Sequence, residues 1–128
     1  MSESVVNVRY MVGDVQEAAD WYVDLMGFSR LPNASPAFAA VERGPLRLLL
    51  SGKASSAGRP MPDGRQPEPG GWTRFQIIVE DLAAEVERLR GEGVRFRNDI
   101  VTGPGGSQIL AEDPSGNLVE LFQPGVWG

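Results

Sequence analysis

The hydrophobic pattern of residues 74–81, RFQIIVED, is typical of a β-strand with one packed face. The odd positions, Phe75, Ile77 and Val79, are apolar, whereas the even positions are mostly polar. Asp81 then predicts the N-cap of a helix, because its carboxylate can accept a hydrogen bond from the free N–H groups of a first helical turn. The stretch therefore predicts a strand that leads directly into a helix.

The same pattern occurs twice along the chain. VRYMVGDVQEAADWYVDLMGF near the start resembles FQIIVEDLAAEVERLRGEGVRF in the middle, with Asp14 in the place of Asp81. Asp14 and Glu17 have the spacing of a capping box, and Gly91 and Gly93 are expected to end the second helix. The apolar residues at helical spacing are Val15, Ala18, Ala19, Tyr22, Leu25 and Met26 in the first helix, and Leu82, Val86 and Leu89 in the second.

Short strand-like segments follow each predicted helix. The first half has FSRL, PAFAAVERG and LRLLLSG, and the second has VRFRND, SQILAED and NLVELFQ. Gly44 and Gly116 precede the last strand of their halves, and each is expected to close a hairpin. Each half therefore predicts the order strand, helix and three strands, with module one at about 5–52 and module two at about 72–124.

The segment between the modules, KASSAGRPMPDGRQPEPGG at 53–71, is rich in Pro, Gly and Ser. It is long for a plain connection within a compact domain. Two interpretations stay open: an ordered lid or interface loop, or a mobile linker.

Composition limits the class of protein. A chain of 128 residues with 41% hydrophobic and 23% charged residues is typical of one globular domain, so a single domain over 1–128 is expected. No apolar run approaches the roughly 18 residues of a membrane span, and the N-terminus lacks the layout of a secretion signal. The chain has no cysteine, which fits a reducing compartment. We expect a cytoplasmic protein without a membrane partner.

Charge and histidine content exclude further functions. The net charge of −5 argues against a nucleic-acid partner, since phosphate binding requires a basic surface. The chain has no histidine. The commonest general base and the commonest metal ligand are therefore both missing.

The repeated pattern resembles the glyoxalase/bleomycin-resistance/extradiol-dioxygenase superfamily, whose fold is called vicinal oxygen chelate. The resemblance rests on VRYMVGDVQEAADWYVDLMGF, IIVEDLAAEVERL and EDPSGNLVELFQP, of which DPSGNLVEL is the most specific, and it covers about 5–124. It implies an α+β fold in which tandem βαβββ modules curl an eight-stranded mixed sheet around a cavity, with the helices outside.

Metal-binding members of this superfamily hold the ion at four strand positions that face the cavity. The resemblance places these positions at Asn7, Leu48, Arg74 and Glu120. Only Glu120 can be an anionic ligand, and the permanently charged Arg74 would repel a cation. We therefore expect no metal and no cofactor, as in the metal-lacking, bleomycin-resistance-like branch, and no metal-dependent glyoxalase or dioxygenase activity.

Strand alternation predicts which side chains line the cavity. These candidate ligand-binding residues are Asn7, Arg9, Met11, Arg74, Gln76, Glu120 and Phe122, with Leu46, Leu48 and Leu50 added by alignment of the two hairpin glycines, and with Phe38 and Trp72 nearby. An apolar wall with a few polar groups is typical of a small-molecule pocket. Arg74 and Glu120 could form an ion pair, which either binds a ligand or only replaces the metal structurally. Trp72 either covers a flat ligand or anchors the long loop.

Two functions follow from this pocket. The first is a non-catalytic binding protein that sequesters an aromatic or polycyclic antibiotic or metabolite, and the resemblance implies that such a protein is a homodimer. The second is a metal-independent enzyme, such as a cyclase, lyase or isomerase, with Glu120 as base and Arg74 as electrostatic stabiliser. We favour the first, because the metal ligands are missing while the pocket pattern is kept.

Overall fold

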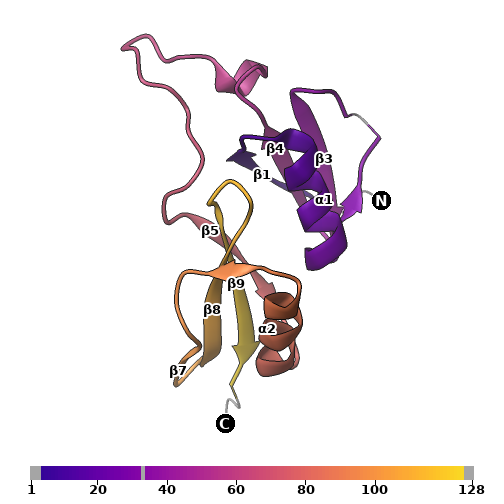
Figure 1. Cartoon of the computed structure of the whole chain (residues 1–128), viewed down its shortest axis with the longest axis vertical. Helices are drawn as coiled ribbons and strands as arrows, with labels where there is room; N and C mark the ends of the chain where they lie inside the picture. The colour runs from indigo at the N-terminus through magenta and orange to yellow at the C-terminus, as the bar shows by residue number, and fades with distance from the viewer. Residues whose placement is uncertain (1–3, 33, 126–128) are drawn as a thin grey trace. The chain divides into compact units, whose positions relative to one another are not determined.

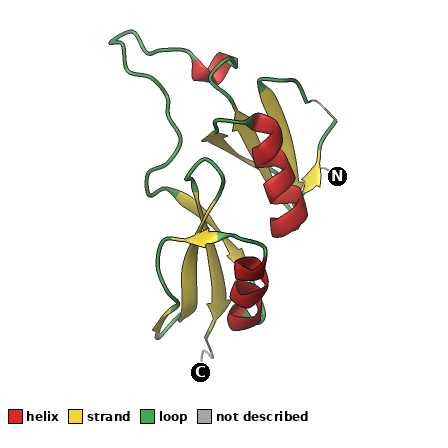
Figure 2. Cartoon of the chain, viewed as in Figure 1, coloured by secondary structure: helices red, strands yellow, loops and turns green. Residues whose placement is uncertain are grey.

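A computed structural model of the chain describes residues 4–32 and 34–125. The chain divides into two compact units, Met1–Gly70 and Gly71–Gly128. The first contains β1 (Val6–Met11), α1 (Val15–Met26), β2 (Ser29–Arg30), β3 (Phe38–Arg43), β4 (Leu46–Ser51) and a short 3-10 helix, η1 (Ser56–Gly58). The second contains β5 (Arg74–Ile78), α2 (Leu82–Gly91), β6 (Arg95–Phe96), β7 (Val101–Gly103), β8 (Gly106–Glu112) and β9 (Leu118–Pro124) (Figures 1 and 2).

The two units share one topology. The first sheet has the strand order β1-β4-β3-β2 and the second has β5-β9-β8-β6, with β7 paired to β8. In each sheet the first strand lies at an edge and runs parallel to the last strand, and the other pairs are antiparallel. The predicted α+β class and the repeated strand–helix–strands order are confirmed. The short strand β7 was not predicted, because three residues are too few to show an alternating pattern.

Both helices begin at the predicted aspartates. Asp14 Oδ1 accepts a hydrogen bond from the N–H of Glu17 at 2.9 Å, and Asp81 Oδ1 accepts one from the N–H of Ala84 at 3.0 Å. The N–H of Leu82 donates to Gln123 Oε1 at 2.8 Å, which ties the start of α2 to β9. Of the described residues, no helix is sufficiently long and apolar to cross a membrane.

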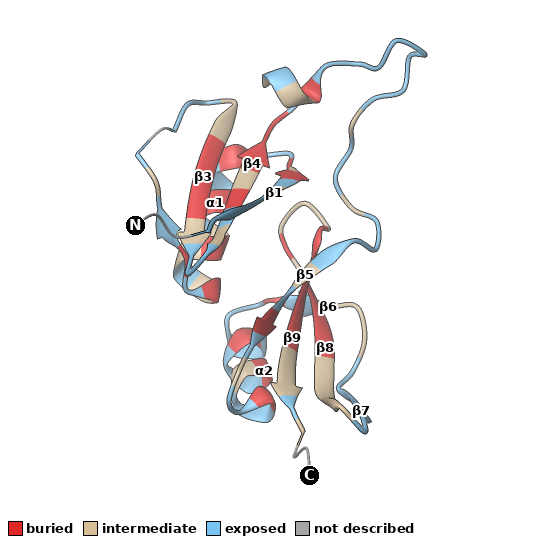
Figure 3. Cartoon of the chain, turned by 180° about the vertical axis from the view of Figure 1, so that it is seen from behind, coloured by how far each residue is buried: buried red, intermediate tan, exposed pale blue. Residues whose placement is uncertain are grey.

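Each helix covers one face of its sheet with the predicted apolar stripe (Figure 3). Below α1 the buried strand residues are Tyr10, Ala39, Val41, Leu48 and Leu50. Below α2 they are Ile77, Ile109, Ala111, Val119 and Leu121. We call the opposite side of each sheet its helix-free face. It carries Asn7, Arg9, Met11, Phe38 and Leu49 in the first unit, and Arg74, Gln76, Leu110, Glu120 and Phe122 in the second.

The prediction that Leu46, Leu48 and Leu50 line the cavity face is wrong. They pair with Val6, Val8 and Tyr10, and they share the face that α1 covers. Leu48 and Leu50 are completely buried there. The residue of β4 that corresponds to Glu120 is Leu49, because Leu49 pairs with Arg9 as Glu120 pairs with Gln76.

The error comes from the hairpin turns. Two residues, Gly44 and Pro45, join β3 to β4, whereas five residues, 113–117, join β8 to β9. Turn length sets strand register, and a shift of one residue moves every side chain to the other face. Gly44 and Gly116 both have positive φ, as hairpin glycines do, but they stand at different places in their turns.

We expect Leu48→Ala to lower the free energy of unfolding by about 2–5 kcal/mol, because it opens a cavity below α1. Leu49→Ala is the matched control, since it changes the same residue type on the same strand but on the helix-free face. Urea denaturation followed by circular dichroism measures both. A smaller loss for Leu48→Ala than for Leu49→Ala would contradict the register described here.

Candidate functional site

The helix-free face of the second sheet gathers four predicted site residues, and a fifth lies next to its edge strand. Arg74 and Gln76 lie on the edge strand β5, and Glu120 and Phe122 lie on the neighbouring strand β9, where Gln76 pairs with Glu120. Trp72 lies just before β5. Strand pairing at a spacing of two residues therefore brings these side chains to one surface, although 46 positions separate Arg74 from Glu120.

Glu120 is held by two neighbours on β5. Arg74 Nε donates to its Oε1 at 2.9 Å, and Gln76 Nε2 donates to its Oε2 at 2.6 Å. The side chain of Glu120 is only 9% exposed, against 33% for Arg74. A carboxylate removed from water needs such partners, because an unpaired buried charge is costly. The predicted ion pair is confirmed, and Gln76 adds a neutral hydrogen bond to the second oxygen.

Trp72 stands at the edge of this surface with 66% of its area exposed. The guanidinium carbon of Arg97 lies 4.5 Å from the centre of its ring, within the range of a cation–π interaction. The carbonyl oxygen of Trp72 accepts a hydrogen bond from Arg74 Nη1 at 3.3 Å. The indole is therefore backed by a cation while much of its surface is open to solvent.

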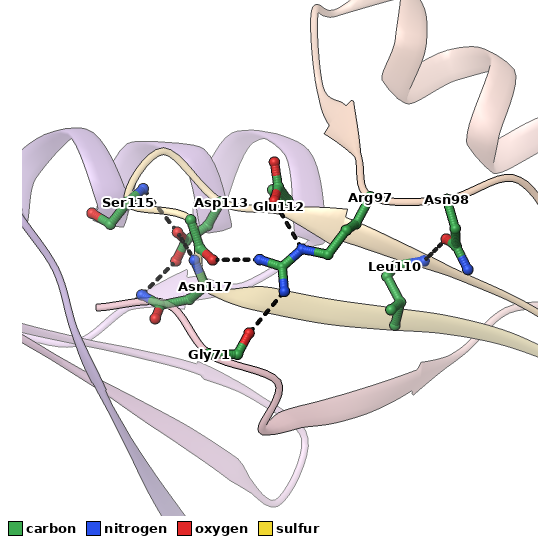
Figure 4. Close-up of polar contacts among 9 residues, drawn as sticks. Gly71, Arg97, Asn98, Leu110, Glu112, Asp113, Ser115 and Asn117 are labelled. Carbon is green, nitrogen blue, oxygen red and sulfur yellow. Dashed lines mark hydrogen bonds and ion pairs between the residues drawn. The ribbon is translucent and has the colours of Figure 1, made fainter. Parts of the chain in front are cut away.

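Arg97 uses every guanidinium nitrogen, as Figure 4 shows. Nε donates to Glu112 Oε2 at 3.0 Å, Nη1 to the carbonyl oxygen of Gly71 at 2.8 Å, and Nη2 to that of Gly116 at 3.1 Å. A guanidinium fixed at three points has little freedom, so it positions the backbone just before Trp72 as well as the ring.

Sequence reasoning missed Arg97. Its segment, VRFRND, was expected to be a strand, but its side chains were not assigned to faces. The available indication was a charge of opposite sign in the neighbouring expected strand, where Glu112 lies.

The DPSGN motif forms the loop that presents Gly116 to Arg97. Asp113 Oδ1 accepts hydrogen bonds from the N–H groups of Ser115 and Asn117, both at 2.9 Å, and its Oδ2 accepts one from Asn117 Nδ2 at 3.2 Å (Figure 4). Asp113 is 1% exposed and Asn117 is 4% exposed. The most specific part of the family resemblance therefore builds a turn.

The first unit places the other predicted residues on its own helix-free face. Asn7, Arg9 and Met11 alternate along the edge strand β1, and Phe38 is opposite Ser51 at the end of β3. Arg9 Nη1 donates to the hydroxyl oxygen of Ser51 at 2.7 Å, and Ser51 is completely buried. This bond fixes the guanidinium of Arg9 against the sheet.

The residues at the family's metal positions do not fit a divalent cation. Within residues 4–32 and 34–125, no three His, Cys, Asp or Glu side chains are grouped so that they could hold an ion. In the second unit, the one carboxylate at these positions, Glu120, is bound by the cation Arg74, which itself stands at another ligand position. In the first unit, the residue that corresponds by strand register to Glu120 is Leu49, whose side chain has no oxygen or nitrogen atom that could bind a metal ion. At these positions, the side chains of the second unit form an ion pair and do not supply the set of oxygen and nitrogen ligands that a divalent cation needs.

Comparison with protein families agrees with the fold. The model of the Glyoxalase/Bleomycin resistance protein/Dioxygenase superfamily matches residues 4–121, so the chain belongs to that superfamily. No protein with a curated description matches it.

Solved structures show the same fold over nearly the whole chain. A superfamily member from Sphaerobacter thermophilus is 26% identical, with 96% of this chain and 98% of that chain covered and a TM-score of 0.75. An antibiotic-binding protein from a Streptomyces species is 25% identical, with 97% and 98% covered and a TM-score of 0.72. A lactoylglutathione lyase from Agrobacterium tumefaciens, at 19% identity, 99% and 98% coverage and a TM-score of 0.74, is similar in fold alone.

We expect Arg74→Met to destabilise the second unit by about 1–3 kcal/mol, because Glu120 loses its charged partner while it stays buried. The double variant Arg74→Met/Glu120→Met should recover much of this loss, since no buried charge is left unpaired. Thermal and urea unfolding measure the stability of the wild type, of Arg74→Met and of the double variant.

The matched control is Arg65→Met, which breaks an exposed pair with Asp63 and should cost less than about 1 kcal/mol. Equal unfolding midpoints for Arg74→Met and Arg65→Met would show that the Arg74–Glu120 pair does not stabilise the fold.

Proposed function

We propose that this protein is a non-catalytic binding protein for a planar aromatic small molecule, such as an antibiotic or a metabolite. The observation that carries the proposal is Trp72, a large aromatic ring that is exposed and yet fixed in place by Arg97. Large exposed apolar groups cost hydrophobic free energy, and an indole fixed in advance loses little entropy when a second ring stacks on it. Trp72 is therefore suited to be a stacking surface.

The neighbouring side chains suit the edges of such a ligand. Ile78 is 55% exposed on the same strand face, and Phe122 is half-buried beside it, so the ligand meets apolar surface beyond the indole. Arg74 and Gln76 supply N–H groups for carbonyl, phenol or carboxylate oxygens. A mostly apolar surface with a few fixed polar groups is the usual composition of a ligand site.

The charges near Trp72 select the kind of ring. The cation of Arg97 already occupies the electron-rich face of the indole, and Arg74 adds a second positive charge nearby. Each guanidinium is paired with a carboxylate, Arg97 with Glu112 and Arg74 with Glu120, which weakens its repulsion of a cation. We therefore expect only a small preference for a neutral or anionic ring over a cationic dye. The similarity to the antibiotic-binding protein from Streptomyces supports an antibiotic as the ligand.

The expected ligand binding is measured with anthraquinone-2-sulfonate as the planar anionic probe and ethidium as the planar cationic one. We expect the sulfonate to quench tryptophan fluorescence and to be recovered chemically unchanged by mass spectrometry. Trp72→Leu should weaken its binding about tenfold, because a stacked aromatic pair contributes about 0.5–1.5 kcal/mol beyond its buried area.

Trp21→Phe is the matched control, since Trp21 packs against Tyr22 within α1 and should leave probe affinity unchanged. Equal affinity of wild type and Trp72→Leu, or a preference for ethidium, would contradict the proposed site.

The alternative function, a metal-independent enzyme with Glu120 as base, is weakened by the contacts of that side chain. Both of its oxygens already accept hydrogen bonds, and one of the donors is a cation. A base must be within reach of the proton that it removes, and little of this carboxylate is exposed. The Arg74–Glu120 pair is thus better suited to a fixed structural anchor for the ligand site.

Glu120→Gln distinguishes the two functions because it keeps the shape of the side chain and removes its charge. For a binding protein we expect probe affinity to change less than about threefold, with no product in either protein. Product formation by wild type at substoichiometric protein, lost in Glu120→Gln, would establish the enzyme instead. Liquid chromatography with mass spectrometry follows the probe over time.

A further inference from the structure

A cavity of about 370 Å³ is lined by residues of the first unit alone. One wall is the end of β1 and the turn after it, residues 11–13. The other wall comes from the connecting loop, namely Lys53 and residues 66–69. Figures 1 and 3 show this part of the loop passing beside the tip of β1. The volume is at the small end of the range for ligand pockets, which is about 300–1,000 Å³.

The loop is ordered on the Lys53 side of the cavity. The N–H of Gly52 donates to the carbonyl oxygen of Ala37 at 2.9 Å, and the hydroxyl of Ser55 donates to the carbonyl oxygen of Gly52 at 2.6 Å. Gly58 packs so closely that an added Cβ would lie 2.3 Å from the carbonyl oxygen of Lys53. These contacts fix the backbone from which the lysine side chain projects.

The loop is also ordered before it returns to the cavity. A tight turn joins the N–H of Met61 to the carbonyl oxygen of Arg65 at 2.7 Å, and Arg65 Nε donates to Asp63 Oδ2 at 2.8 Å. Pro67 and Pro69, which follow, restrict the backbone on both sides of Glu68. Because residues 66–69 are already restricted, this wall of the cavity loses little conformational entropy when a ligand binds.

Two opposite charges line this cavity without neutralising each other. Across the described ranges of the chain, neither Lys53 nor Glu68 makes an ion pair or a hydrogen bond through its side chain. Met11, Val12 and the two prolines are the apolar residues of the lining. A purely anionic ligand would be repelled by Glu68, and a purely cationic one by Lys53.

We propose that this cavity is a second ligand site, which binds a zwitterionic amino acid with an apolar side chain. Its carboxylate pairs with the ammonium of Lys53, its ammonium pairs with the carboxylate of Glu68, and its side chain lies against Met11 and Val12. The volume is sufficient for one amino acid. This site does not depend on the proposed function of the second unit, because it shares no residue with it.

The test uses L-phenylalanine as the zwitterion, phenylalanine amide as the analogue without a carboxylate, and N-acetylphenylalanine as the analogue without an ammonium group. Isothermal titration calorimetry should show that each analogue binds the wild-type protein about two- to fivefold more weakly than L-phenylalanine, because each loses one ion pair with an exposed side chain. Absence of binding of L-phenylalanine up to about 10 mM, or equal binding of the three compounds, would overturn the proposal.

Two variants assign the charges separately. Lys53→Gln should abolish the preference for L-phenylalanine over the amide and keep the preference over the acetylated compound, and Glu68→Gln should do the reverse. Arg59→Gln and Glu87→Gln are the matched controls, since both side chains are exposed and lie outside the cavity. Unchanged preferences in Lys53→Gln and Glu68→Gln would sink the proposal.

Lys53 also offers an independent measurement, because it is the only lysine in the chain. Saturating L-phenylalanine should slow the acetylation of Lys53 by an N-hydroxysuccinimide ester relative to that of a lysine-containing reference peptide in the same solution, as followed by peptide mass spectrometry. The reference is needed because the amine of the ligand also consumes the ester. Phenylalanine amide should leave the ratio of the two acetylation rates unchanged. Trp72→Leu should leave this protection intact, so failure of the aromatic site and failure of the amino-acid site give different results. Equal acetylation rates with and without L-phenylalanine would contradict the site.

Discussion

The three hydrogen bonds of the Arg97 guanidinium are the contacts on which the arrangement of the surface around Trp72 depends. They join β8 through Glu112, the DPSGN loop through Gly116, and the chain before β5 through Gly71. The chain around residues 71, 97 and 112–116 thus meets at one planar cation, which lies over the ring of Trp72. A lysine at this position would provide a point charge without the planar geometry that allows bonding at the edge and stacking at the face. Positioning of the indole is therefore a property of the whole unit.

The Arg74–Glu120 pair gives this surface a different chemistry from that of metal-binding relatives. A metal ion attracts anionic ligands through its own positive charge, and it can exchange its bound water for them. An ion pair has little net charge, and Gln76 engages the remaining carboxylate oxygen. The surface thereby presents shape and oriented N–H groups, which are suited to recognition. The superfamily fold is compatible with this change, because the same strand positions accept either type of group without a change in topology.

Much of the fold could be predicted from local patterns, because each element carries its own periodicity. Asp14 and Asp81 identified both helices, and the alternation in β5 correctly assigned Arg74 and Gln76 to the face opposite Ile77. The assignment failed for Leu48, because the three consecutive leucines 48–50 show no alternation and the turn before β4 was given the wrong register. The exposed Arg47 was the signal that could have corrected it. Arg97 and the wall around Lys53 were also missed, because contacts between distant segments leave no local periodicity. The face of a strand on which a residue lies can often be predicted from local sequence, whereas its contacts with distant segments depend on tertiary packing.

The unequal hairpin turns of the two modules have a consequence for the comparison of repeated and related sequences. Counting from Gly44 and from Gly116 gives residues on opposite sides of the sheet, although the two glycines look equivalent in an alignment. The edge strand, β1 or β5, is a better reference for aligning the two units. The pair Arg9–Leu49 in the first unit corresponds structurally to the pair Gln76–Glu120 in the second. In families built by internal duplication, a ligand position transferred through a turn glycine is inverted wherever the spacing between that glycine and the following strand position has changed by an odd number of residues. The metal-ligand positions of a family member should therefore be assigned from strand pairing before that member is said to have lost or kept its metal site.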